Sequence, residues 1–345
     1  MRKFNEENER IKRKYLRYIK EAKRQDVKSV DKAAAAIFRF EETTKFKSFK
    51  LFHIDQAITF KRKLEAAKNA RTGKPLSKST IDGTLRLVKA FVHWLAGQQG
   101  YKSRISYSDA EYFNNSAKDA RIAHAQREVR YPTMAQAFHA FSQMPNETEI
   151  ERRNKAVFAF VMMTAARDGA IASLTLKRHC SKYNNVSQDA RDVNTKGAKT
   201  FTTWFMPVDT AYHQCFEDWV GYLRVTKLFG NDDALFPKPI LGLGETGGVV
   251  VAGLSRDPYA NGHKICEITK QAFSNAGLPV FTPHGFRKTL AMYGDEICTT
   301  REAFKAWSLN IGHTNLVTTV QSYMPVSTQR QKELIKGMVD GAKSP

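Results

Sequence analysis

The chain has 345 residues, enough for two domains that each bury a core of their own. A hydrophobic content of 42%, with 11% aromatic residues, indicates a folded globular protein. No apolar run reaches the roughly 20 residues of a membrane-spanning helix, and the first residues lack the apolar core of a signal peptide. We therefore expect a cytoplasmic protein without a membrane partner, associated with the nucleoid if it is bacterial.

The four cysteines are far apart and include no C-x-x-C pair, so we expect neither a zinc site nor a disulfide framework. They are Cys180, Cys215, Cys266 and Cys298.

The formal net charge is +21 and is unevenly distributed. Residues 1–125 contain 29 Lys and Arg against 14 Asp and Glu, a net charge of +15, which leaves +6 for residues 126–345. Lys and Arg that neutralise phosphates release counterions, so this charge predicts salt-sensitive binding to nucleic acid with a large sequence-independent part. The alternative is a globular protein that is merely basic.

Helical patterns dominate the first third of the chain. Residues 5–24 are strong helix formers with a dense basic face, which could either lie on DNA or face solvent. Further helices are expected near residues 30–40 and 54–68. The side of the first helix that we expect to be apolar carries Ile11, Tyr15, Tyr18 and Ile19.

The clearest helix of this region covers residues 77–98, where apolar residues recur every three or four positions. Ser77 or Ser79 can cap its start. The periodic residues are Ile81, Leu85, Val88, Val92 and Leu95; the candidate DNA-binding residues are Lys78, Arg86 and Lys89. We predict a helical, basic DNA-binding domain over residues 1–118, a linker over 119–132 and a second domain over 133–345.

The second domain is predicted to begin with a helix over residues 134–141, capped by Thr133. The segment 151–169 is predicted to form a helix that ends at Arg167, next to Gly169. The middle of this helix is apolar on all sides, so it should be buried. The period then changes: residues 186–193 and 199–206 are typical of two strands. Gly197 suits the tight turn between them, which leaves Lys196 at its tip.

A helix over residues 212–229 follows, with Trp219, Leu223 and Leu228 as core candidates. Residues 230–261 are rich in Gly and Pro and are predicted to be a loop. Its segment G-L-G-E-T-G-G lacks the strand–loop–helix context of a nucleotide-binding site. A helix is expected over 263–277, and Pro283 can begin another.

The region from His284 to Tyr323 contains three motifs: H-G-F-R ending at Arg287, I-G-H ending at His313, and T-T-V-Q-S-Y ending at Tyr323. His284 and Arg287 share a helix face because they are three residues apart.

Together with Arg167 and Lys196, these motifs resemble the tyrosine recombinase (phage integrase) family over the whole chain. The resemblance implies a mainly α fold with a small antiparallel β-sheet in the catalytic domain (α+β), a two-domain DNA clamp, and a bacterial or phage origin. It also implies DNA integration or recombination, as in a mobile genetic element.

The resemblance assigns a role to each residue. Tyr323 attacks a DNA phosphate and forms a 3′-phosphotyrosyl intermediate, which a second DNA end can reverse without ATP. Arg167 and Arg287 bind the non-bridging oxygens, in place of a metal ion or other cofactor. Lys196, with Lys199 as the alternative, protonates the leaving 5′ oxygen. His284 takes part in proton transfer with Tyr323, and His313 hydrogen-bonds the phosphate.

Two features depart from the family pattern. Ala170 occupies a position that is often acidic, a role that Asp168 could take over or that could be lost. The step from His313 to Tyr323 is one residue longer than is most common. Tyr293 is the nearest competing tyrosine, but it falls within a predicted helix, where the family does not place its nucleophile.

Residues 327–340 are predicted to form a C-terminal helix that packs either on its own domain or, as in the family, on a neighbouring protomer. Its apolar face carries Leu334, Ile335, Met338 and Val339. We therefore expect a dimer on each double-stranded DNA site and a tetramer on two. The other hypotheses are a type IB topoisomerase, a catalytically silent DNA-binding protein with this fold, and a metal-dependent nuclease, for which no acidic cluster stands out.

Overall fold

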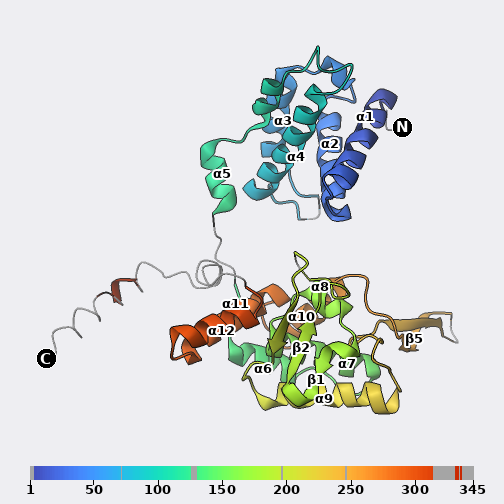
Figure 1. Cartoon of the computed structure of the whole chain (residues 1–345), viewed down its shortest axis with the longest axis vertical. Coiled ribbons are helices and arrows are strands. Elements are labelled where there is room, and N and C mark those ends of the chain that lie inside the picture. The colour runs from blue at the N-terminus through green and yellow to red at the C-terminus, as the bar shows by residue number, and fades with distance from the viewer. Residues whose placement is uncertain are drawn as a thin grey trace. The chain divides into compact units, whose positions relative to one another are not determined.

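The computed structural model describes residues 4–70, 72–125, 130–195, 197–244, 247–313, 331–333 and 335. The chain divides into two compact units, Met1–Arg127 and Glu128–Pro345. This division falls inside the predicted linker, residues 119–132. The predicted fold class, mainly α with small antiparallel sheets, is confirmed (Figure 1).

The first unit is built from helices packed around one aromatic-rich core. Its helices are α1 (Glu6–Arg17), a π-helical turn (Tyr18–Ala22), α2 (Val27–Thr43), a 3-10 turn (Phe49–Leu51), α3 (Ile54–Ala66), α4 (Lys78–Ala96), a 3-10 segment (Tyr107–Phe113) and α5 (Ala117–His124). In α4 all five periodic residues are buried, and the Ser77 side chain accepts from the Thr80 N–H at the helix start. The predicted amphipathic helix is thus confirmed.

A buried polar group joins α1 to α2. The Glu41 carboxylate accepts from Lys12 Nζ at 2.5 Å and from Asn8 Nδ2 at 3.1 Å. Burial raises the pKa of Glu41, although the bonds from Lys12 and Asn8 act in the opposite direction. The basic helix α1 is therefore anchored through one of its own lysines.

Helix α5 occupies the first part of the predicted linker and packs on α4. Lys78 Nζ lies 2.9 Å from the Asp119 carboxylate, and His124 Nε2 lies 3.5 Å from the Asp82 carboxylate. Polar composition alone did not indicate this helix, because its polar residues are the ones that join it to α4.

The second unit surrounds the buried helix α7. Its helices are α6 (Met134–Ser142), α7 (Glu149–Thr164), α8 (Asp168–Ser173), α9 (Thr210–Gly221) with a π-helical turn (Tyr222–Thr226), α10 (His263–Asn275), α11 (Pro283–Ile297) and α12 (Arg301–Asn310), with 3-10 turns at Leu176–Arg178 and Ser181–Tyr183. Its strands are β1 (His179–Cys180), β2 (Asn185–Gln188), β3 (Phe201–Trp204), β4 (Pro239–Leu243) and β5 (Val249–Leu254).

Helix α7 ends earlier than the sequence predicts. Its last residue is Thr164, and Ala165 has a left-handed backbone with φ of 51°. The Thr164 hydroxyl accepts from the Ala166 N–H, which supports this break. Arg167 therefore does not end a helix: it lies in extended backbone as the N-cap of α8.

The strands β1, β2 and β3 form one antiparallel sheet in that order, with Gln188 opposite Phe201. The prediction that the first long strand continues to Val193 is wrong. It ends at Gln188 because Asp189 forms a turn, in which its carboxylate accepts from the Arg191 main chain and guanidinium.

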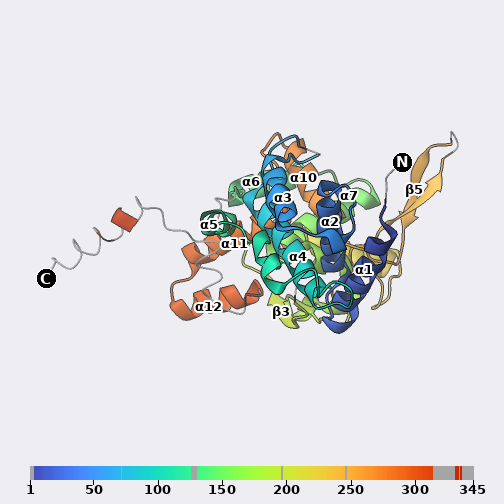
Figure 2. The ribbon, with the colours of Figure 1, turned by 90° about the horizontal axis from the view of Figure 1, so that it is seen from above.

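The prediction of a loop over residues 230–261 is wrong in part, because this segment contains a second antiparallel sheet, β4 with β5. This hairpin extends away from the helices of its unit (Figure 2). The segment G-L-G-E-T-G-G runs from the end of β4 towards β5 and precedes a strand, so it lacks the context of a nucleotide-binding loop. Leu228, expected in the core, is 73% exposed.

Thr133 caps α6 and Pro283 begins α11, both as predicted. No helix among the described residues is long and apolar enough to cross a membrane.

Candidate active site

Arg287 is the buried centre of the candidate site. It lies in the first turns of α11 and is 3% exposed. One guanidinium nitrogen, Nη1, donates to the Ala165 carbonyl at 2.5 Å, and Nη2 donates to the Ile311 carbonyl at 2.9 Å. Ala165 is the left-handed residue after α7, so the break in that helix supplies an acceptor for Arg287. The guanidinium thereby joins the segment before Arg167 to the end of α12.

His313 follows α12 through a tight turn. Gly312 has φ of 84°, a conformation that favours glycine, and a Cβ there would lie 2.7 Å from the Phe201 ring. The Gly312 and His313 N–H groups donate to the Leu309 and Ser308 carbonyls, at 2.8 and 3.1 Å. The I-G-H motif thus turns His313 back towards Arg287, whose Nη2 lies 2.9 Å from His313 Nε2.

The pKa of His313 depends on the other predicted site residues. Its pKa is lowered to about 4, mainly by burial and then by the positive charges of Arg287, Arg167 and Lys199 and by His284. Coulombic effects of this kind require neighbouring groups. The structure thus brings together Arg167, His284, Arg287 and His313, which come from three parts of the second unit: the start of α8, the first turns of α11 and the turn after α12.

Arg167 and His284 are more accessible than Arg287 and His313. Arg167 is half-buried, and His284, the second residue of α11, is exposed. Two buried groups, Arg287 and His313, therefore form a rigid base, and two accessible groups border it. This arrangement presents permanent positive charge to an anion at the surface, which is what recognition of a phosphate requires.

Tyr323 and Lys196 lie outside the described residues, so their predicted roles stay predictions. Lys199, the alternative to Lys196, is described: it lines the same cavity as His313 and its charge lowers the pKa of that histidine.

Tyr293 and Asp168 both have structural contacts. The Tyr293 hydroxyl donates to the Pro207 carbonyl at 3.1 Å, and its ring packs against Trp307. The Asp168 carboxylate accepts from the Cys266 thiol at 3.4 Å, and a Cβ on Gly262 would lie 2.7 Å from the Asp168 side chain. Asp168 is thus packed against the start of α10. Ala170 is buried.

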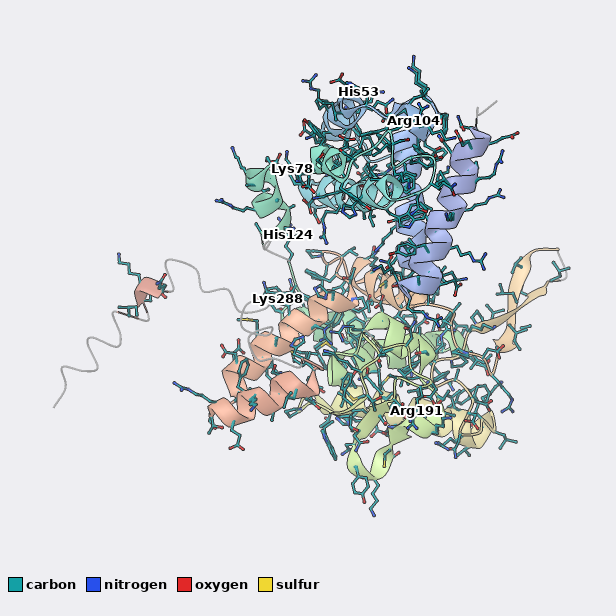
Figure 3. All side chains as sticks on the ribbon, turned by 45° about the horizontal axis from the view of Figure 1, so that its top comes forward. His53, Lys78, Arg104, His124, Arg191 and Lys288 are labelled. Carbon is teal, nitrogen blue, oxygen red and sulfur yellow. The ribbon has the colours of Figure 1, made fainter. Side chains whose placement is uncertain are left out.

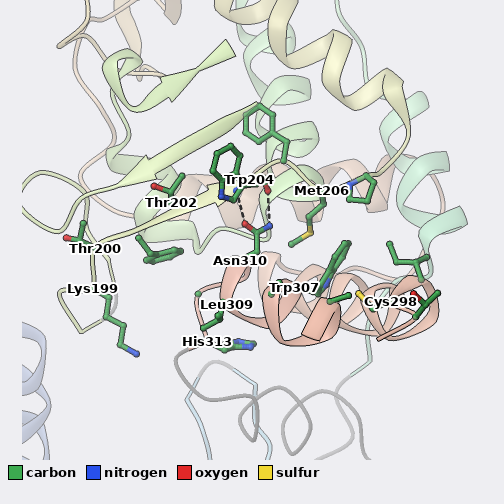
Figure 4. A pocket seen from close by; sticks show the side chains of 18 residues that line it. Lys199, Thr200, Thr202, Trp204, Met206, Cys298, Trp307, Leu309, Asn310 and His313 are labelled. Atoms are coloured by element: carbon green, nitrogen blue, oxygen red, sulfur yellow. Dashed lines mark hydrogen bonds between the residues drawn. The ribbon is translucent and has the colours of Figure 1, made fainter. Parts of the chain in front are cut away.

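A cavity of about 1020 Å³ adjoins His313. It lies between β3 and α12, and Figure 4 shows Lys199 and His313 along its lower rim. Its apolar lining includes Trp204, Met206, Trp307 and Leu309.

The candidate DNA-binding residues of α4 differ in their surroundings. Lys78, labelled in Figure 3, pairs with Asp119, and Lys89 Nζ lies 2.8 Å from the Glu111 carboxylate. Arg86 is exposed. The ion pairs engage two of these cations within the unit, so Arg86 stays the most accessible of the three, and DNA binding by all three stays a prediction.

The fold is that of tyrosine recombinases, the proteins to which this structure is similar. A lambda integrase dimer bound to a COC′ core site has a TM-score of 0.61 at 9% identity and covers 91% of this chain and 94% of that chain. The XerH site-specific recombinase bound to palindromic difH substrate, in a post-cleavage complex, has a TM-score of 0.58 at 16% identity, with 92% and 81% covered. The Tn1549 transposon integrase in complex with circular intermediate DNA has a TM-score of 0.57 at 13% identity, with 94% and 98% covered.

The sequence itself matches no family model and no curated protein. At identities of 9 to 16% the likeness establishes the fold, and function has to be argued from the residues of the site.

Proposed function

We propose that the protein is a site-specific DNA recombinase that cleaves and rejoins duplex DNA through a covalent bond between Tyr323 and a 3′ phosphate. The observation that supports this most directly is the contact of the Arg287 guanidinium with His313 Nε2 at 2.9 Å and with the carbonyl of Ala165, two residues before Arg167. The motif assigns these residues to phosphate binding, and the charges of Arg287 and Arg167 also lower the pKa of His313.

In the proposed cleavage step the Tyr323 phenol oxygen attacks phosphorus and its proton passes to His284. The bond between phosphorus and the 5′ oxygen breaks, and its electron pair leaves with that oxygen, which takes a proton from Lys196. Arg167 and Arg287 stabilise the additional negative charge on the non-bridging oxygens. Rejoining is the reverse reaction with the 5′ hydroxyl of another end, so the step needs no ATP.

A neutral His313 suits this role. Its pKa of about 4 keeps the ring uncharged near neutral pH. Because Nε2 accepts from the Arg287 guanidinium, the ring carries its proton on Nδ1 and can donate it in a hydrogen bond. The phosphate would then meet two charged guanidinium groups and one neutral donor.

The basic first unit supports DNA as the substrate. Residues 1–125 carry most of the net charge of +21, which favours salt-sensitive binding along the phosphate backbone. The proposed assembly is a dimer on each DNA site and a tetramer on two sites, and a DNA-associated location follows from it. The C-terminal segment 327–340 would pack on a neighbouring protomer; apart from residues 331–333 and 335, it lies outside the described residues.

The test is covalent adduct formation on duplex fragments from both sides of the gene. The wild type should give a protein–DNA adduct that survives SDS, is removed by protease and forms equally well in EDTA. Tyr323→Phe should bind the same DNA without forming the adduct. A normal adduct yield from that variant would refute the assignment of Tyr323.

Further measurements separate the rival functions. Relaxation of supercoiled DNA without any need for a second site would favour a type IB topoisomerase. Specific DNA binding without adduct from nicked suicide substrates would favour a silent binding protein, and cleavage that EDTA abolishes would favour a nuclease.

A further inference from the structure

The turn over residues 310–313 connects α12 to β3 through one side chain. The Trp204 N–H donates to Asn310 Oδ1 at 2.7 Å, and Asn310 Nδ2 donates to the Trp204 carbonyl at 2.8 Å (Figure 4). The Asn310 carbonyl also accepts from the Thr203 hydroxyl at 3.2 Å. Asn310 thus makes three hydrogen bonds to two consecutive residues of β3.

The following residues of this turn contact Arg287 and β3 alternately. The Ile311 carbonyl accepts from Arg287, Gly312 packs against the Phe201 ring, and His313 accepts from Arg287. The turn is therefore held between the buried guanidinium on one side and β3 on the other.

Strand β3 begins just after the segment of the chain that carries Lys196 and Lys199. Phe201 follows Lys199 by two residues and Lys196 by five. On its other side β3 pairs with β2, and Gln188 Nε2 donates to the Thr203 hydroxyl at 2.9 Å. The position of Lys199 relative to Arg287 therefore depends on how β3 is fixed to the turn at residue 310.

Asparagine is chemically suited to this position. Its amide offers one donor and one acceptor with the spacing of a peptide group, so it can pair with the main chain of a strand as a neighbouring strand would. Alanine provides neither group at its side chain, and aspartate provides acceptors only, one of which would face the Trp204 carbonyl.

We infer that Asn310 is a positioning residue for strand cleavage: it keeps β3, and with it the lysine that protonates the leaving oxygen, in place relative to Arg287 and His313. This inference depends on the proposed function, because it assigns Asn310 to that same site.

The experiment measures the single-turnover rate of adduct formation by the full-length protein on DNA carrying the mapped cleavage site. Asn310→Ala and Asn310→Asp should each slow the reaction roughly 10- to 100-fold, since a displacement of about 1 Å can cost that much. DNA affinity should be unchanged within about twofold, because the Asn310 side chain is engaged with the main chain of β3 and the effect is on orientation of the reacting groups. Asn310→Gln, which retains the donor and the acceptor of the side-chain amide, should react faster than Asn310→Ala and Asn310→Asp.

A second substrate distinguishes positioning of the lysine from general damage. In DNA with a 5′-bridging sulfur at the cleaved phosphate, the leaving group is a thiolate that needs no proton, because a thiol is far more acidic than an alcohol. Both variants should therefore approach the wild-type rate on this DNA. Equal losses on the two substrates would overturn the inference.

Thr148→Ala provides the matched control. Thr148 caps the start of α7, sixteen residues from the end that meets the site, so its loss lowers the stability of the same unit at a remote point. A rate loss with Thr148→Ala as large as that with Asn310→Ala would also overturn the inference. No adduct from the wild type on either substrate would instead refute the proposed function.

Discussion

Arg287 and His313 share a hydrogen bond in which the guanidinium Nη2 donates to the imidazole Nε2 over 2.9 Å. A guanidinium only donates, so the imidazole has to accept and cannot carry a second proton while this bond exists. The low pKa of His313, caused first by burial and then by the charge of Arg287, agrees with this geometry. A second positive charge is thus avoided beside the buried Arg287.

His313 should make stability depend on pH between about 6.5 and about 4. The folded-state pKa is about 4, below the ordinary value of 6.5, so the unfolded chain binds more protons in this interval. The contribution is fully present above about pH 6.5 and is lost as the pH falls towards 4; the shift corresponds to about 3 kcal/mol. Urea unfolding at about pH 7.5 and about pH 4.5 measures it.

His313→Gln should show a smaller loss of stability between the two pH values than the wild type. His263→Gln is the control, since the side chain of His263 is 78% exposed. If the wild type and His313→Gln lose equal stability on acidification, His313 is not the group responsible.

Gly312→Ala should destabilise the second unit through two effects. A left-handed backbone costs a residue with a Cβ roughly 1 kcal/mol or more, and the new Cβ would also lie 2.7 Å from the Phe201 ring. Gly277→Ala isolates the first effect, because Gly277 has φ of 68° and nothing within 4 Å of its Cβ position.

The loss of unfolding free energy should therefore be larger for Gly312→Ala than for Gly277→Ala, by about 1–3 kcal/mol for the steric overlap. Adding Phe201→Ala to Gly312→Ala should reduce that excess, as a double-mutant cycle would measure. Identical losses for the two glycine variants would mean that Phe201 moves aside at no cost.

Local patterns explain what the sequence could predict. The apolar residues of α4 recur with helical period, and Pro283 begins α11, because both features depend on residues that are neighbours along the chain. The site motifs are also local, and their order indicated which of them belong together.

Contacts between distant segments explain what could not be predicted. Asn310 meets Trp204 across 106 positions, and Arg287 meets Ala165 across 122. In both contacts the partner atoms belong to the main chain of Trp204 or Ala165, so residue type does not indicate them and only the fold identifies them. In the missed hairpin, frequent glycines obscured β4, although the run Val249–Val251 just after two glycines is a strand signal.

The choice between Lys196 and Lys199 as proton donor can be decided by substrate chemistry. Lys196 matches the family motif, whereas Lys199 lines the same cavity as His313. We expect Lys196→Ala to lose roughly 10²- to 10⁴-fold in adduct formation on ordinary DNA, the usual contribution of a general acid. It should recover most of this on DNA with a 5′-bridging sulfur.

Lys199→Ala should lose less, and to the same extent on both substrates, because Lys199 would act only through its charge. Recovery of Lys199→Ala on the sulfur-containing DNA, without recovery of Lys196→Ala, would transfer the role of proton donor to Lys199.

Glu41→Ala should destabilise the first unit by roughly 1–3 kcal/mol, because it removes the buried acceptor that Lys12 and Asn8 share and leaves Lys12 with Glu9 alone. The Glu41 side chain is fully buried, whereas that of Lys12 is 11% exposed.

Replacing both residues, with Lys12→Met and Glu41→Leu, should recover most of the lost unfolding free energy, since apolar residues of similar size carry no charge to desolvate. Amide hydrogen exchange of α1 and α2 in the full-length protein, as a function of urea, measures both variants. Glu21→Ala is the control: Glu21 pairs with Lys20 at the surface, where the loss should stay below about 1 kcal/mol. A loss from Glu41→Ala no larger than that from Glu21→Ala would show that the buried pair contributes little to anchoring α1 on α2.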